Sequence, residues 1–107
     1  VCSVLPAFAQ SGRGGGFTGP SVEISTVEAV QKMRDDTYVA LEGLIERSLG
    51  DEKYLFRDST GTITVEIDND DWRGLSVGPE DTVIIYGEVD KNFRRIEIDV
   101  DRIVLKQ

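Results

Sequence analysis

The chain has 107 residues, and its 20 acidic residues outnumber 12 Lys and Arg residues, which gives a formal net charge of −8. This length supports one modest hydrophobic core. The acidic charge disfavours binding to nucleic-acid phosphates and docking onto anionic lipid. With no His and one Cys, these residues build no Ser–His–Asp triad, Cys–His dyad or Cys/His zinc site. We therefore expect no enzyme activity, catalytic residue, metal site or cofactor.

The first nine residues read as the end of a secretory signal peptide. Residues 1–9 are uncharged and mostly apolar or small, and Ala7-Phe8-Ala9 has the A-x-A pattern that signal peptidase accepts. We expect cleavage after Ala9 and export to a bacterial periplasm. The alternative is a native terminus in which the pattern occurs by chance.

Residues 10–20 differ in composition from the rest of the chain, since five of the eleven are Gly. Such a stretch has too little apolar surface to offset its ordering entropy, so we expect a flexible leader. Residues 21–107 then form the folded domain. No apolar run is long enough to span a bilayer, and no membrane insertion is expected.

The domain is expected to begin with a helix and continue as strands. Ser25 and Glu28 fit a capping box, and apolar residues at helical spacing predict a helix of about ten residues ending near Arg34. Beyond Thr37 the apolar period becomes two. Strands are expected at 38–49, 53–58, 62–67, 82–89 and 93–106, with one helical turn at 70–73.

Two irregularities inform the fold prediction. Gly43 lies where the phase of the first strand becomes ambiguous, which predicts a bulge or bend in a strand that serves two sheets. The parity of the last strand slips before Ile103, which predicts a second bulge. Together with a helix between the third and fourth strands, these features predict a mainly β protein, a five-stranded OB-fold Greek-key barrel preceded by a short N-terminal α-helix. An SH3-like barrel or a five-stranded sandwich explains the connector less naturally.

Several runs are similar to one protein family. They are Arg34-Asp35-Asp36-Thr37-Tyr38-Val39, Tyr54-Leu55-Phe56-Arg57-Asp58, Gly61-Thr62-Ile63-Thr64-Val65-Glu66-Ile67-Asp68, Gly87-Glu88-Val89-Asp90-Lys91 and Glu97-Ile98-Asp99-Val100. Over residues 19–106 the chain resembles the bacterial OB-fold (BOF) family of periplasmic stress-tolerance proteins. The resemblance implies a signal peptide, a periplasmic location, a helix before the barrel and no known catalytic activity. It also implies tolerance of oxidants, toxic metals, acid or cationic peptides, but no agreed ligand.

OB-folds bind ligands on the face of their second and third strands, which here are residues 53–58 and 62–67. Aromatic rings there would stack on a ligand, and Arg residues would hold anionic groups. The candidate ligand-binding residues are Tyr54, Phe56, Arg57, Arg73, Phe93, Arg94 and Arg95. The expected partner is a small envelope ligand, such as a glycan or peptidoglycan fragment, or a periplasmic protein. We expect Phe56 to point inward, Tyr54 to lie at the barrel rim, and Trp72 to plug the barrel end.

The carboxylates suggest an alternative function. The run Asp68–Asp71 fits a calcium loop poorly, because the first loop position is Asn69 and the fifth is Arg73, a cation where a ligand oxygen is needed. Glu97 and Asp99 project from one face of the last strand, together with Asp101, and read first as a solvated surface. The alternative is an acidic protein that weakly sequesters divalent cations or cationic peptides.

Overall fold

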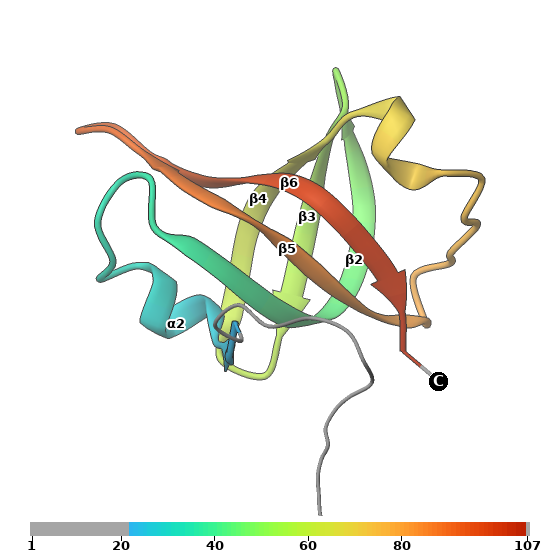
Figure 1. The fold of residues 1–107 in the computed structure, drawn as a ribbon, viewed down its shortest axis with the longest axis horizontal. Helices are drawn as coiled ribbons and strands as arrows, with labels where there is room; N and C mark the ends of the chain where they lie inside the picture. Colours follow the sequence, from blue (N-terminus) through green and yellow to red (C-terminus); the bar gives the residue numbers. More distant parts are fainter. Residues whose placement is uncertain (1–21, 107) are drawn as a thin grey trace, which may run out of the picture.

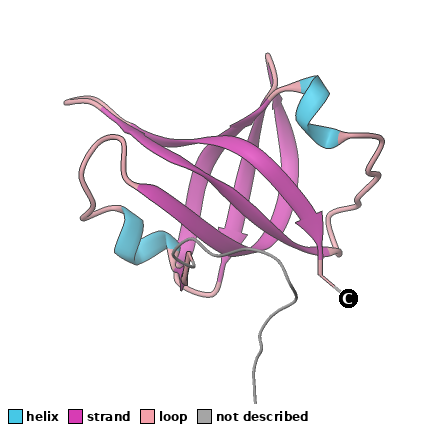
Figure 2. Cartoon of the chain, viewed as in Figure 1, coloured by secondary structure: helices cyan, strands magenta, loops and turns pink. Residues whose placement is uncertain are grey.

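The structure is a computed structural model that describes residues 22–106, so the expected signal remnant (1–9) and the expected leader (10–20) lie outside the described residues. Strands dominate it (Figures 1 and 2). The elements are β1 Ile24–Ser25, α2 Val27–Val30, β2 Tyr38–Gly50, β3 Lys53–Asp58, β4 Gly61–Ile67, the 3-10 helix η1 Asn69–Trp72, β5 Thr82–Lys91 and β6 Ile96–Leu105. None of the described helices is long and apolar enough to cross a membrane.

The sheet closes into a barrel through β2. The strand order is β1-β2-β3-β4-β6-β5, and β2 also pairs with β5. Residues Tyr38–Leu44 of β2 pair with β5, and residues Leu44–Gly50 pair with β3. β4 and β6 are parallel, whereas the other barrel pairs are antiparallel. This closed five-stranded barrel is the predicted OB-fold.

Gly43 permits the bend at which β2 changes partner. A Cβ atom at this position would collide with the Arg57 carbonyl oxygen and lie 2.9 Å from the Phe56 ring. The bend is therefore confirmed, but the register shifts follow it, between Ile45 and Arg47 and again between Ser48 and Gly50. The second predicted bulge is confirmed: Tyr86 pairs with Arg102 and Gly87 with Val100, which leaves the intervening residue of β6 without a partner.

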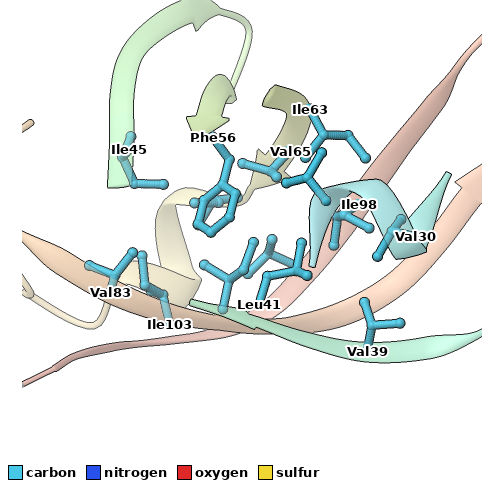
Figure 3. Packing of buried hydrophobic residues seen from close by; sticks show 14 of the residues in the cluster. Val30, Val39, Leu41, Ile45, Phe56, Ile63, Val65, Val83, Ile98 and Ile103 are labelled. Atoms are coloured by element: carbon cyan, nitrogen blue, oxygen red, sulfur yellow. The ribbon is translucent and has the colours of Figure 1, made fainter. Parts of the chain in front are cut away.

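The core fills the barrel interior, with the Phe56 ring among branched aliphatic side chains (Figure 3). Phe56 has no exposed surface, as predicted for an inward residue, and Ile63 and Val65 of β4 face it from the neighbouring strand. Buried and more exposed side chains alternate along the strands, with the same period of two that the apolar residues show in the sequence. The other buried members are Val27, Val30, Val39, Leu41, Ile45, Ile67, Val83, Ile85, Val89, Ile98, Val100 and Ile103.

The helix α2 is one turn long, not ten residues, and it is capped differently from the capping-box expectation. The N-cap is Thr26, whose hydroxyl accepts from the Ala29 amide at 3.1 Å, so Ser25 is not the cap. The β3–β4 turn supplies the remaining acceptors: Asp58 Oδ2 accepts from the Val27 amide at 2.8 Å, and Thr60 Oγ1 accepts from the next amide at 3.0 Å. These bonds hold a helix that is too short to be stable alone.

Asp58 also accepts three hydrogen bonds within its own turn. Its Oδ1 accepts from the Thr60 amide and hydroxyl at 2.7 and 2.6 Å and from the Gly61 amide at 3.2 Å. Burial of the carboxylate raises its pKa, but the hydrogen bonds from Thr60, Val27 and Gly61 outweigh burial, and the pKa of Asp58 lies below its ordinary value. The charged form therefore stabilises the folded state.

Truncating the strand β3 aromatics should separate core from rim. We expect Phe56→Ala to lower the free energy of unfolding by about 3–5 kcal/mol, because it removes a fully buried ring. Tyr54→Ala should cost less, since Tyr54 is only partly buried. Urea melts of both variants provide the measurement, with Phe93→Ala, 91% exposed, as the near-neutral control. Equal losses for Tyr54 and Phe56 would contradict the distinction.

Asp58→Asn should destabilise the protein in a pH-dependent way. Because the folded-state pKa is depressed, the carboxylate stabilises the fold above its unfolded pKa, and this stabilisation is lost as pH falls through the folded pKa. We expect a loss of about 1–2 kcal/mol near neutral pH. The difference from the parent should narrow below about pH 4. Urea melts across this range, with Asp36→Asn as control, provide the measurement, and a pH-independent difference would refute the assignment.

Candidate functional site

An open groove lies where the second half of β2 faces the segment after η1. We call it the Tyr54–Trp72 groove, and its volume is about 350 Å³. That volume falls within the usual range for small-ligand sites, which starts near ~300 Å³. The lining residues come from β2, β3, η1 and the following loop, and they are Ile45, Glu46, Arg47, Ser48, Tyr54, Trp72, Leu75, Ser76, Val77, Gly78 and Pro79.

Two aromatic rings line this groove. Tyr54 and Trp72 meet edge to face, with ring centroids 5.5 Å apart and an interplanar angle of 76°. Both are half-buried and pack against the core. η1 ends at Trp72, and the next residue, Arg73, has a left-handed conformation with a φ of 51°, which turns the chain directly after Trp72. Trp72 therefore packs against the core and also lines the groove.

The groove has two charged residues in its lining, Glu46 and Arg47. Glu46 is already paired, because Arg57 Nε donates to its Oε1 at 2.7 Å. That hydrogen bond is the main cause that lowers the pKa of Glu46. Within residues 22–106, Arg47 has no ion-pair partner. The groove thus combines aromatic surface with one cation whose hydrogen-bonding capacity is not used by a carboxylate.

A larger groove, about 550 Å³, lies between β1 and the end of β3, and we call it the β1–β3 groove. Its charged side chains are Glu42, Arg57 and Asp58. Each is already bonded: Glu42 to Lys106 at 2.7 Å, Arg57 to Glu46, and Asp58 to the turn and helix amides. Among residues 22–106, none of the residues that line it is aromatic. The smaller groove is therefore the better candidate for recognition.

The outward face of β3 and β4 lacks the aromatic surface that the sequence reading placed there. Inward Phe56 alternates with Leu55 and Arg57, which face the other way. On this side Lys53 Nζ donates to both Glu97 oxygens, at 3.2 and 3.1 Å, and Arg95 lies 3.5 Å from the same carboxylate. Glu97 is 7% exposed, and this pairing compensates its buried charge.

The β5–β6 hairpin tip projects from the barrel on the side opposite η1 (Figure 1). Phe93 is 91% exposed, and the Arg94 guanidinium lies 5.3 Å from the centre of its ring. Asn92 Oδ1 accepts from the Arg94 and Arg95 amides at 2.8 and 3.1 Å, which fixes the turn. None of these residues lines either groove.

The predicted site residues therefore do not form one site. Tyr54 lies in the Tyr54–Trp72 groove, and Arg57 lies in the β1–β3 groove. Phe56 offers no surface to a ligand, because its side chain points into the barrel and is completely buried in the core. Arg73 is exposed and follows Trp72 but does not line the groove.

Sequence reasoning missed Arg47 and the loop Leu75–Pro79 as parts of the groove. No sequence pattern identifies Arg47, since its position depends on the bulge in β2. The loop carries a weak signal, because the apolar residues Leu75 and Val77 alternate with polar or small residues in a segment that the sequence predicts to be a connector. Both pack against the core.

A third feature is an acidic cluster at the end of β4. Among the described residues, Glu52, Glu66 and Asp68 can bring one oxygen each within 4.8 Å of one another. Burial raises the pKa of Glu66, and Asp99 raises it further. The pKa of Asp99 is also raised, first by burial and then by neighbouring carboxylates such as Asp68. These carboxylates repel one another.

Comparison with known proteins gives consistent matches over most of the chain. The chain is 48% identical to "Protein YgiW" of Escherichia coli K12, over 96% of this chain and 89% of that protein. It is 39% identical to the "Calcium-regulated OB-fold protein CarO" of Pseudomonas aeruginosa, over 80% of this chain and 76% of that one. The solved structure of YgiW from E. coli superposes with a TM-score of 0.79 and covers 87% of this chain and all of that one.

The family model described as the bacterial OB fold (BOF) protein matches residues 5–105. This match spans nearly the whole chain and agrees with the closed five-stranded barrel. The chain therefore belongs to the bacterial OB-fold (BOF) family.

Proposed function

We propose that this protein is a non-enzymatic periplasmic binding module that takes a glycan or peptidoglycan fragment in the Tyr54–Trp72 groove. One observation carries the proposal: two half-buried aromatic rings line an open groove of about 350 Å³. The C–H face of a sugar ring packs on an aromatic face, and the groove adds hydroxyl groups from Ser48 and Ser76 for hydrogen bonds to sugar hydroxyls.

A small ligand suits this groove better than a protein partner. A stable protein interface buries about 800 Å² on each side, which is a broad surface and not a narrow groove. The chain's acidic charge and the absence of a basic groove among the described residues favour a ligand other than nucleic acid. Partner proteins remain the alternative ligand class for the binding module.

Two further points support the periplasmic setting and a role in envelope stress. Residues 1–9 fit the end of a cleaved signal peptide, with cleavage after Ala9. The relative CarO carries a name that says it is regulated by calcium. We extend both to this chain as part of the proposal.

A titration with a purified disaccharide muropeptide should test the groove. Trp72 is the one Trp of the chain, so its fluorescence reports on the groove directly. We expect saturable fluorescence changes, with amide shifts in two-dimensional NMR centred on Tyr54, Trp72 and the Leu75–Pro79 loop. Tyr54→Ala should weaken binding about 3- to 10-fold through lost ring contact, roughly 0.5–1.5 kcal/mol.

Two control variants make this titration decisive. Tyr54→Phe keeps the ring and should bind like the parent, and Phe93→Ala changes an exposed aromatic outside the groove. Shifts centred on the β5–β6 hairpin, or equal losses in Tyr54→Ala and Phe93→Ala, would contradict the assignment of the groove.

The second candidate function is weak sequestration of divalent cations, and the acidic cluster favours it. The carboxylates of Glu52, Glu66 and Asp68 converge within 4.8 Å, and oxygen ligands of this kind suit Ca²⁺. A bound cation would relieve the repulsion that helps raise the pKa of Glu66.

A calcium titration followed by NMR tests this second candidate. We expect amide shifts at Glu52, Glu66 and Asp68 that weaken with added monovalent salt. Glu66→Gln should reduce the apparent affinity several-fold, whereas Glu28→Gln on α2 should leave it unchanged. Shifts spread evenly over all acidic positions, or equal effects of both variants, would rule out a site at this cluster.

A further inference from the structure

We infer that the Tyr54–Trp72 groove selects acidic saccharides, and that Arg47 is the residue that distinguishes a carboxylate-bearing ligand from a neutral one. This inference rests on the proposed function and names the ligand class for the same groove. It begins from an unusual local charge: on a chain with a net charge of −8, the uncompensated charge in the groove lining is positive.

The local charge is positive because an ion pair already neutralises the negative charge of Glu46. The groove lining contains Glu46 and Arg47 as its charged residues, and Arg57, outside the lining, binds Glu46 at 2.7 Å. Glu46 is thereby neutralised by a residue that faces the β1–β3 groove. Arg47 is left without an ion-pair partner in the described part of the chain. A ligand carboxylate would therefore meet one available guanidinium.

The bulge in β2 explains why both residues line the groove. Consecutive residues of a regular strand face opposite sides. Here Ile45 pairs with Phe56 and Arg47 with Leu55, so Glu46 is the extra residue of a bulge. A bulge interrupts the alternation and re-aims a side chain. Glu46 and Arg47 consequently line the same groove although they are adjacent in sequence.

Within residues 22–106, Arg47 is the one Lys or Arg residue that lines the groove, and several cations elsewhere are already engaged. Lys53 and Arg95 both bind Glu97, and Lys106 binds Glu42 at 2.7 Å. Arg94 lies over the Phe93 ring at the hairpin tip. Arg47 combines an exposed position with a planar guanidinium, which binds carboxylates with two parallel hydrogen bonds.

A matched pair of ligands tests the inference. One disaccharide consists of N-acetylglucosamine linked to N-acetylmuramic acid, and the other of two N-acetylglucosamine units, so the acidic one differs by a lactyl group that carries a carboxylate. Trp72 fluorescence titrations at low salt should give about 5- to 10-fold tighter binding of the acidic disaccharide. This preference should shrink as salt is added.

Variants at Arg47 identify the residue responsible. Arg47→Gln should bring the acidic disaccharide to the affinity of the neutral one and leave the neutral one unchanged. Arg47→Lys should keep part of the preference. Arg102→Gln, which removes a cation stacked on Tyr86 elsewhere on the barrel, should keep all of it. Thermal melts of each variant verify that the fold is intact.

The outcomes separate the inference from the proposed function. Equal binding of both disaccharides by the parent, or a preference that survives in Arg47→Gln, would overturn the inference while the groove remains a glycan site. No fluorescence change with either disaccharide, and none with the larger muropeptide, would overturn both. A salt-independent preference would assign the selectivity to shape and would also refute the role of Arg47.

Discussion

The bend of β2 at Gly43 is the constraint on which the rest of the structure depends. Up to Leu44 this strand pairs with β5, and from Leu44 onward it pairs with β3. The change of partner brings the Arg57 carbonyl and the Phe56 ring so close to Gly43 that a side chain at this position would not fit. The barrel closes because the bend occurs, and the second half of β2 then forms one wall of the Tyr54–Trp72 groove.

The two ends of the barrel are closed in different ways, and the difference leaves a site at one of them. At one end α2 buries Val27 and Val30, and the carboxylate of Asp58 holds the start of this short helix. At the other end Tyr54 and Trp72 pack against the core but keep part of their surface exposed. Residues that complete the core at this end are therefore also available to a ligand.

The charge of the whole chain does not describe the charge of the groove. Among the described residues four cations are used in ion pairs, and they are Lys53, Arg57, Arg95 and Lys106. Arg47 is not among them, so the groove is locally positive on an acidic protein. The carboxylates that remain uncompensated gather elsewhere, around Glu66 and Asp99, where burial and mutual repulsion raise their pKa values.

The sequence by itself determined the strands, the bend at Gly43, the inward position of Phe56 and the family resemblance, because apolar periodicity and glycine placement are local signals. It did not determine the site. The predicted residues came from one strand, one hairpin and, in the case of Arg73, the connector between β4 and β5, and the barrel separates Tyr54, Arg57 and Phe93 into three places. Only the tertiary structure decided that a groove forms between β2 and the Leu75–Pro79 loop, because that proximity depends on closure of the sheet. It also decided the availability of Arg47, because the partner of Glu46 comes from another strand.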